Sequence, residues 1–416
     1  MILCTICAVS VFAQEPEVKS PSVILIDAKT GIPIYEKNAT ERLYPASITK
    51  LMTMLLIMEY IDKNPNALDE RVYFSDYAVN SLPWDSSGIG MIEGESLTLE
   101  QTIYAVLLAS ANEASNAAAE HIAGSVPAFV DKMNEKVLEL GCVNTRFANP
   151  HGLEDDGHYT CAYDMSLIMR ECVTHKDFEK YISTAKYEIP PTEIETQTRY
   201  MVNTNKLIQP NSPYYNPEVV GGKTGYTTPA MHTLVTFSRR GGLSLICVCM
   251  HANKNEPYED TTALINYGFE QFADIRIFDS TLFNDAANLI PVYDGEGEFL
   301  ENAVLGADGN ITMELPKGAA DRLVTRLDVP DKSQAPVSAF EVVGKADIFY
   351  DADREIPLGS ADVFARNSVQ APAPPTAPDK SFLLTILKVC GTLAAVFAAA
   401  LTIALLRMKR GTKNDI

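Results

Sequence analysis

Apolar residues in the first two thirds of the chain predict strands at both ends of this region. Residues 22–27 and 32–36 are apolar runs joined by a short turn that contains glycine, which predicts a β-hairpin. Residues 219–226, 234–237 and 243–252 are also typical of strands. Because helical patterns lie between these two groups of strands, we expect one sheet assembled from both ends of the region.

Helical spacing dominates the part of the chain between these strands. Residues 48–58 are apolar on almost every side, which predicts a helix buried in the core. The pattern from residue 70 to residue 149 is helical throughout. The clearest helices are expected at residues 99–108, 114–123, 129–140, 164–173 and 259–272.

The pattern changes after residue 274. Residues 275–366 consist of short alternating segments interrupted by glycine, which predicts a small all-β domain. Residues 367–380 are rich in proline and are expected to form a semi-rigid linker. Residues 381–407 are long and apolar enough for a transmembrane helix, and a basic tail follows at 408–416. Because positive residues favour the cytoplasmic side, we expect the body of the protein outside the cell membrane.

Composition and the N-terminus agree with an exported protein. The net charge of −20 argues against nucleic acid as a partner. Residues 1–13 are apolar and end in a small residue, as in a signal peptide, although the positive first region is lacking. The exported part contains an odd number of cysteines, so we expect free thiols rather than a disulfide framework. These are Cys142, Cys161, Cys172, Cys247 and Cys249, of which the last two alternate and should share one face of a strand.

The first candidate catalytic residues lie at the start of the apolar helix. Ser47 and Lys50 are three residues apart, so a helix would place the hydroxyl and the amine side by side, as a nucleophile beside its base. Pro45 suits a first helical turn, where free backbone N–H groups can stabilise an oxyanion. The same spacing recurs at Ser183 and Lys186, but no apolar helix follows, which indicates a solvated turn or strand there.

Two further motifs follow in order. Ser110 and Asn112 flank one alanine at a predicted helix junction, where either residue could also be an ordinary helix cap. Lys223-Thr224-Gly225 lies in a predicted strand, where a glycine lets another backbone approach. A second Lys-Thr-Gly at residues 29–31 lies in the hairpin turn and precedes the nucleophile.

Ser-x-x-Lys, Ser-x-Asn and Lys-Thr-Gly in this order resemble the three motifs of penicillin-binding proteins and serine β-lactamases. The sequence between these motifs, for example Pro-His-Gly-Leu at 150–153, is similar to that of the serine D-Ala-D-Ala carboxypeptidases. The resemblance covers residues 21–272 well and implies a catalytic domain at 20–274. The implied fold class is α+β, an antiparallel sheet flanked by helices with a helical subdomain.

The resemblance also implies roles for four catalytic residues. Ser47 would attack the carbonyl between two D-alanines, and Lys50 would take its proton. Ser110 would relay that proton to the leaving amine, and Asn112 would orient Lys50 and the substrate amide. Water would then hydrolyse the acyl-enzyme and release the shortened peptide.

The strand motif would bind the substrate. By the same resemblance, Lys223 and Thr224 would hold the terminal carboxylate, with Gly225 and Tyr226 beside the peptide. The backbone N–H groups of Ser47 and Tyr226 would form the oxyanion hole. The implied partners are peptidoglycan stem peptides ending in D-Ala-D-Ala and β-lactams as covalent inhibitors, and no cofactor or metal is expected.

Alternatives remain open at this point. A class A β-lactamase would need a glutamate followed four residues later by asparagine, and residues 113–222 contain no such pair. A zinc peptidase could use the His and Asp residues of 151–158, but their spacing matches no H-E-x-x-H pattern. A wall-binding protein without activity is the third possibility. The sequence Ala-Met-His at 230–232 departs from the family's usual Ala-Gly, which leaves the strand spacing there open.

Overall fold

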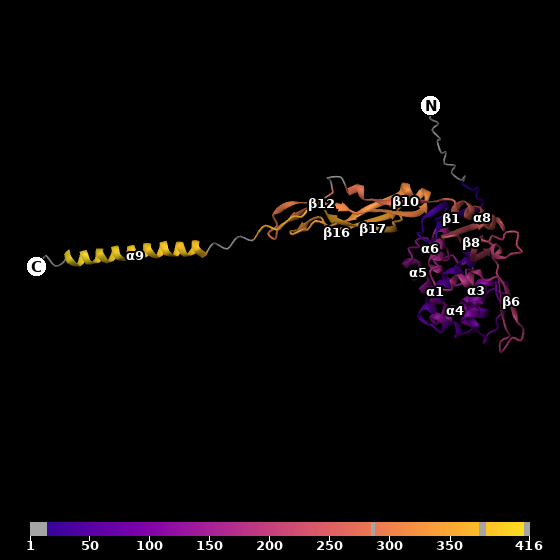
Figure 1. Ribbon diagram of the computed structural model, residues 1–416. Helices are drawn as coiled ribbons and strands as arrows, with labels where there is room; N and C mark the ends of the chain where they lie inside the picture. The colour runs from indigo at the N-terminus through magenta and orange to yellow at the C-terminus, as the bar shows by residue number, and fades with distance from the viewer. Residues whose placement is uncertain (1–14, 284–287, 374–379, 412–416) are drawn as a thin grey trace, which may run out of the picture. The chain divides into compact units, whose positions relative to one another are not determined.

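The computed structural model describes residues 15–283, 288–373 and 380–411 (Figure 1). The predicted signal peptide lies outside these residues. Contacts divide the chain into two compact units, and the first unit joins the chain up to residue 279 with residues 309–326 and 346–361. The second unit contains the remaining β-segments and the C-terminal helix.

A five-stranded antiparallel sheet forms the centre of the first unit. Its order is β2-β1-β9-β8-β7, so strands from the two ends of the region pair directly, with Ile24 opposite Val248. This arrangement confirms the prediction of one sheet built from both ends. The strands are β1 (Ser22–Asp27), β2 (Pro33–Lys37), β7 (Val219–Thr227), β8 (Met231–Arg240) and β9 (Leu243–Ala252).

The two faces of this sheet contribute to two separate cores, because side chains alternate along a strand. Ile24 and Val248 belong to the large core with the helices, whereas Leu25 faces helix α8 (Glu256–Phe269). Cys247 and Cys249 lie together on the α8 side. They are free thiols, as expected, and so are Cys142, Cys161 and Cys172.

Helices cover the other face of the sheet (Figure 1). The apolar helix is α1 (Lys50–Lys63), which follows the 3-10 turn η1 (Ala46–Thr49) and is buried over its first nine residues. The others are α2 (Asp76–Asn80), α3 (Leu99–Leu108), α4 (Asn112–Ala123), α5 (Val126–Glu139), α6 (Ala162–Cys172) and α7 (Phe178–Ser183).

The expectation of helix throughout residues 70–149 is wrong at its start. Strands β3 (Arg71–Tyr73) and β4 (Ser96–Thr98) pair there, and an irregular loop connects α2 to β4. Each strand has three residues and buries one apolar side chain, too few to show alternation. The hairpin of β5 (Lys186–Ile189) and β6 (Arg199–Val202) lies in the segment between α7 and β7.

The chain after residue 271 is rich in strands, as predicted. Strands β10 (Phe272–Asp279) and β13 (Asn310–Pro316) pair with each other, and a six-stranded sheet has the order β14-β16-β17-β12-β11-β15. These six are β11 (Leu289–Tyr293), β12 (Phe299–Ala307), β14 (Leu323–Asp328), β15 (Ser333–Gln334), β16 (Val342–Tyr350) and β17 (Ile356–Ala365).

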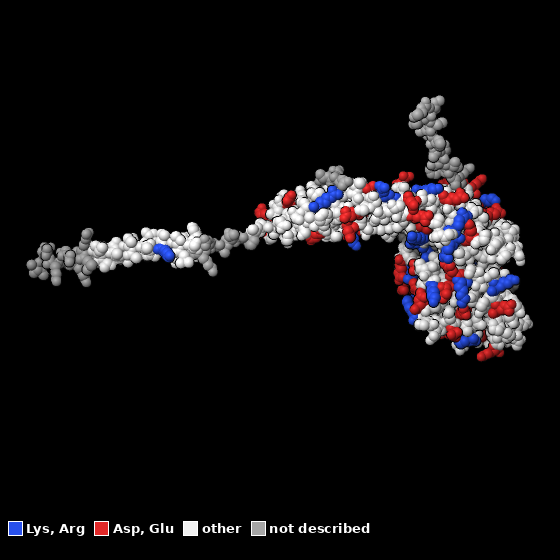
Figure 2. All heavy atoms as spheres, viewed as in Figure 1, with Lys and Arg blue, Asp and Glu red and all other residues white. Residues whose placement is uncertain are grey.

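The last helix, α9 (Lys380–Gly411), contains a segment long and apolar enough to cross a membrane. This segment is Ser381–Leu405, with a mean hydropathy of 2.1. Figure 2 shows acidic and basic side chains intermixed over the visible face of the first unit, whereas the segment Ser381–Leu405 of α9 has a single charged residue, Lys388. The helix thus agrees in position with the predicted transmembrane segment.

Candidate active site

Ser47 and Lys50 are neighbours at the start of the buried helix. Ser47 lies in the 3-10 turn η1, Lys50 is the first residue of α1, and the Lys50 Nζ to Ser47 Oγ distance is 3.1 Å. Lys50 is fully buried, and Ala46 just before the serine has a left-handed φ of 51°. Strained backbone of this kind is concentrated at functional sites.

Two oxygen acceptors hold the amine of Lys50. Its Nζ donates to Asn112 Oδ1 and to the backbone carbonyl of His151, each at 2.7 Å. Neither oxygen can donate, so a neutral amine would use both hydrogens there and direct its lone pair at Ser47. Burial lowers the pKa of Lys50 well below its ordinary value, and the charge of Lys223 lowers it further.

The loop that carries the His151 carbonyl is fixed against helix α1. Thr53 donates to the carbonyl of Pro150 at 2.6 Å, and a Cβ on Gly152 would lie 2.0 Å from the Ala46 oxygen. Gly152 also has a φ of +94°, so glycine suits this position for two reasons. No pattern in the sequence predicted this acceptor for Lys50, because a backbone carbonyl has no residue-type signature.

His158 contacts Thr49, the last residue of the turn that carries Ser47. Its Nδ1 accepts from the Ala148 N–H at 3.0 Å, so its Nε2 carries the proton and donates to Thr49 Oγ1 at 2.8 Å. Burial lowers the pKa of His158 to about 4, so the ring is neutral at pH 7. The leading cause is loss of solvation, and Lys50 contributes in the same direction.

Ser110 lies between α3 and α4 in an unusual conformation. Its φ is 58°, it is buried, and its Oγ has no hydrogen-bond partner among the described residues. The N-cap of α4 is Ala111, so the interpretation of Ser110 or Asn112 as an ordinary helix cap is wrong. A buried hydroxyl without a protein partner, two residues before the asparagine that holds Lys50, is available to a substrate.

Strand β7 lies directly beside the serine. A Cβ on Gly225 would lie 2.8 Å from the backbone nitrogen of Ser47, so only glycine lets the strand come this close. Lys223 is buried and donates to the carbonyl of Thr224 at 2.8 Å, and burial lowers the pKa of Lys223 to about 7. The hydroxyls of Thr224 and Thr204 lie 2.6 Å apart.

The sequence Ala-Met-His at 230–232, which differs from the usual Ala-Gly of the family, does not disturb the pairing of β7 with β8. Tyr226 pairs with His232 and Thr227 with Met231, so β7 and β8 remain in register up to their turn. A bulge follows where His232 and Leu234 pair with β9. The ring of Tyr226 is 59% exposed and lies 4.5 Å from that of His232.

The duplicate motifs lie elsewhere. Ser183 and Lys186 are solvated, as predicted, but Ser183 ends a helix and only Lys186 lies in a strand. Ser183 is exposed at the end of α7 and donates to the Lys180 carbonyl, while exposed Lys186 begins β5. Thr30 of the first Lys-Thr-Gly donates to Asp27 in the hairpin turn at 2.5 Å. Neither copy faces the pair of Ser47 and Lys50.

The metal alternative finds no support in this geometry. Nδ1 of His151 accepts from the Leu153 N–H at 3.2 Å, and both nitrogens of His158 already have protein partners. Within residues 15–283, 288–373 and 380–411, no group of three or more His, Cys, Asp or Glu side chains could hold a metal ion.

A buried, deprotonable amine beside a serine hydroxyl, next to an edge strand open to a peptide, defines the class of active-site serine acyl-transfer enzymes. The model of the Peptidase S11 family, D-alanyl-D-alanine carboxypeptidase, matches residues 9–254, and that of the penicillin-binding protein 5 C-terminal domain matches residues 282–370. The chain therefore belongs to the Peptidase S11 family and is a serine peptidase of the D-Ala-D-Ala carboxypeptidase type.

Individual proteins are similar to this chain over most of its length. The D-alanyl-D-alanine carboxypeptidase DacF of Bacillus subtilis is 34% identical over 328 residues, which are 78% of this chain and 80% of that protein. The structure of penicillin binding protein 5 from Haemophilus influenzae covers 86% of this chain and 99% of its own, with 26% identity and a TM-score of 0.63. A peptidoglycan synthesis regulatory factor (PBP3) from Streptococcus pneumoniae covers 85% and 100%, with 26% identity and a TM-score of 0.60.

Proposed function

We propose that this protein removes the terminal D-alanine from peptidoglycan stem peptides ending in D-Ala-D-Ala, through an acyl-enzyme on Ser47. One observation carries the proposal. The amine of Lys50 is held by Asn112 Oδ1 and the His151 carbonyl, so that its third position faces Ser47 Oγ at 3.1 Å. That is the geometry of a nucleophile with its base.

The acylation step follows from these contacts. Neutral Lys50 accepts the proton of Ser47 while Ser47 Oγ attacks the carbonyl carbon of the penultimate D-alanine. The backbone N–H groups of Ser47 and Tyr226 stabilise the oxyanion, a contribution worth about 10²–10³ in rate for each donor. The proton then passes to the leaving amine by way of Ser110, whose Oγ has no other partner among the described residues.

Substrate binding uses strand β7, which is the edge strand of the sheet. A peptide can pair along this edge as an added strand. Lys223 and Thr224 hold the terminal carboxylate of the substrate, and Tyr226 lies beside the peptide. Gly225 leaves room for the turn that carries Ser47, which brings the nucleophile to this strand. Asn112 uses its oxygen for Lys50, so its NH₂ group can orient the substrate amide.

Deacylation and inhibition use the same groups. After D-alanine leaves, Lys50 activates a water that attacks the ester carbonyl, which returns Ser47 and releases the shortened peptide. A β-lactam presents a strained amide and a carboxylate to the same site, so it acylates Ser47 as a covalent inhibitor. The proposal needs neither metal nor cofactor.

The proposed location is the outer face of the cell membrane. Helix α9 anchors the chain through Ser381–Leu405, and the basic residues after it favour a cytoplasmic tail. The catalytic domain, proposed at residues 20–274, and the β-rich domain at 275–366 then lie outside the cytoplasm, where stem peptides are found.

Covalent labelling with a fluorescent penicillin tests this proposal. Ser47→Ala should abolish labelling, whereas Ser183→Ala, the matched change in the second Ser-x-x-Lys, should leave it intact. Folding of both variants is checked by circular dichroism. Labelling lost only in the Ser183 variant would overturn the assignment. Release of D-alanine from a pentapeptide ending in D-Ala-D-Ala, measured on the same proteins, separates an enzyme from an inactive binder.

A further inference from the structure

The loop at residues 81–95, between α2 and β4, lies beside the candidate active site with little apolar support. Of its fifteen positions only Met91 and Glu95 are buried. A hollow of about 290 Å³ adjoins the loop and is lined in part by Trp84, Gly88 and Glu113. The position of this loop therefore depends on polar contacts more than on packing.

Helix α4 contacts the loop through Asn112 of the Ser-x-Asn motif and through the next residue, Glu113. The backbone N–H of Asn112 donates to the Ser87 carbonyl at 2.9 Å. The carboxylate of Glu113 accepts from the Ile89 N–H at 2.6 Å. A Cβ on Gly88 would lie 2.7 Å from that carboxylate, so the loop backbone is in close contact with it. Any displacement of the loop therefore acts directly on Asn112, which holds Lys50.

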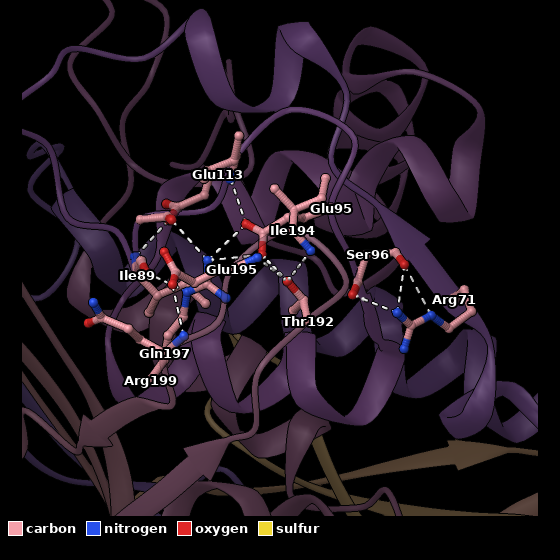
Figure 3. A network of polar contacts seen from close by, with 12 residues as sticks. Arg71, Ile89, Glu95, Ser96, Glu113, Thr192, Ile194, Glu195, Gln197 and Arg199 are labelled. Carbon is pink, nitrogen blue, oxygen red and sulfur yellow. Dashed lines mark hydrogen bonds and ion pairs between the residues drawn. The ribbon is translucent and has the colours of Figure 1, made fainter.

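Arg199 holds the other side of the loop. It projects from β6, and its Nε donates to the Ile89 carbonyl at 3.0 Å while its Nη2 donates to the Gly90 carbonyl at 3.0 Å (Figure 3). Its side chain is only 9% exposed. A planar guanidinium can reach two neighbouring carbonyls at once, which a lysine ammonium cannot do from the same position.

Glu95 fixes Arg199 in this position. Its carboxylate is fully buried and accepts from Arg199 Nη2 at 2.8 Å, from Thr192 Oγ1 at 2.5 Å and from the Ile92 N–H at 2.7 Å (Figure 3). Burial by itself acts to raise the pKa of Glu95, but these hydrogen bonds outweigh it and lower the pKa. The carboxylate thus remains charged opposite the guanidinium.

The segment after β6 contacts strand β7, on the other side of the candidate active site. Five residues beyond Arg199, the hydroxyl of Thr204 lies 2.6 Å from that of Thr224 on β7. One short stretch of chain therefore contacts the loop that supports Asn112 and the strand proposed to bind the substrate carboxylate. The positions of the loop and of strand β7 are therefore linked through the segment between Arg199 and Thr204.

We propose that Glu95 and Arg199 are positioning residues for acyl transfer: they hold the loop at 81–95 so that it fixes Asn112, and through it Lys50. The proposal rests on the roles proposed above for Asn112 and Lys50. Neither positioning residue touches the substrate. Their removal should slow acylation while leaving the carboxylate contacts of Lys223 and Thr224 in place.

Arg199→Lys is the sharpest test, because it keeps a positive charge beside Glu95 and removes the forked contact to the two loop carbonyls. We expect its acylation rate constant with a fluorescent penicillin to fall about 10²-fold, the order that a misplacement of about 1 Å can cause. With the pentapeptide substrate, kcat should fall and KM should change by less than about threefold. A general loss of structure would instead lower the melting temperature.

A second variant removes the whole ion pair. Glu95→Leu combined with Arg199→Met leaves no buried charge unpaired, and such replacements are often neutral for stability. The matched control is Glu36→Leu with Arg354→Met, which removes a 2.7 Å ion pair that does not contact the loop. Gly88→Ala provides a change without any charge, since its Cβ would press on the Glu113 carboxylate.

The inference holds if Arg199→Lys, the double variant and Gly88→Ala acylate slowly at an unchanged melting temperature while the control matches the unmodified protein. It is overturned if Arg199→Lys acylates within about twofold of the unmodified protein, or if the control slows as much. If one variant fails to fold, the remaining two decide. Failure of the proposed function would appear differently, as labelling that persists in Ser47→Ala.

Discussion

The backbone nitrogen of Ser47 lies 2.8 Å from the point that a Cβ atom of residue 225 would occupy, so Gly225 lets strand β7 touch the nucleophile. The same Cβ would stand 2.5 Å from Thr233 Oγ1 on the neighbouring strand. Thr233 in turn donates to the carbonyl of Pro45 at 3.0 Å. The turn that carries the serine thus contacts both β7 and β8.

Gly225→Ala should therefore reduce acylation without preventing folding. The added methyl group forces β7 or the serine turn to move, which displaces the proposed oxyanion donor, and the loss of one such donor costs about 10²–10³ in rate. Stopped-flow acylation by a penicillin measures the effect. Gly242→Ala is the control, since no heavy atom of the described residues lies within 4 Å of its Cβ position. Equal rates in the two variants would contradict the close fit.

Removal of the C-terminal helix should release the protein from the membrane without loss of activity. Ser381–Leu405 is apolar, and the active-site groups lie between residues 46 and 233, so the site owes nothing to the helix. A chain ending near Pro374 should appear in the soluble fraction and still be labelled by penicillin. Its recovery in the membrane fraction would show that a second anchor exists, for example an uncleaved leader.

Residue types and their order predicted the side chains that now lie together. Ser47 and Lys50 were placed by their spacing, and the β7 motif by its position in a predicted strand and its order after the other two motifs. Four strands of the central sheet, β1, β7, β8 and β9, were also recognisable, because each buries several side chains. Strand β2 buries none fully and was recognisable by the glycine turn that joins it to β1. These features have local signatures, so no tertiary information was needed to find them.

The supporting contacts had no such signature. The His151 and Ser87 oxygens act as backbone acceptors, which any residue type could supply. Glu95 and Arg199 are 104 positions apart, and nothing in either neighbourhood marks them as partners. The three-residue strands β3 and β4 are too short for a period, which is why a helix was expected over them.

The buried histidine behind the nucleophile should make the fold sensitive to acid. The pKa of His158 is about 4 in the folded state, because burial disfavours the charged ring, against 6.5 when unfolded. Between these values the unfolded chain binds more protons, so stability falls as the pH falls from 6.5 through 4. The difference corresponds to about 3 kcal/mol for this group. His158→Gln should lose that part of the pH dependence in urea unfolding. Parallel curves for the two proteins would contradict it.

The pH dependence of acylation should report the amine of Lys50. Its pKa is lowered by burial and by Lys223, so the neutral, basic form becomes populated well below pH 10.5. The rate of acylation should therefore rise with pH through an inflection below that of free lysine. Lys50→Arg should nearly stop acylation, since a guanidinium stays protonated. Acylation by the arginine variant at near the original rate would rule out Lys50 as the base.

Lys223 provides the second half of this prediction. The pKa of Lys223 itself is about 7, and its charge acts on Lys50, so the observed inflection belongs to the coupled pair. Lys223→Met removes the repelling charge, which lets Lys50 hold its proton to higher pH and moves the inflection upward. The same change removes a contact to the substrate carboxylate, so KM for the pentapeptide should rise. An inflection that stays in place or moves downward would show that Lys223 does not act on the base, whatever its effect on KM.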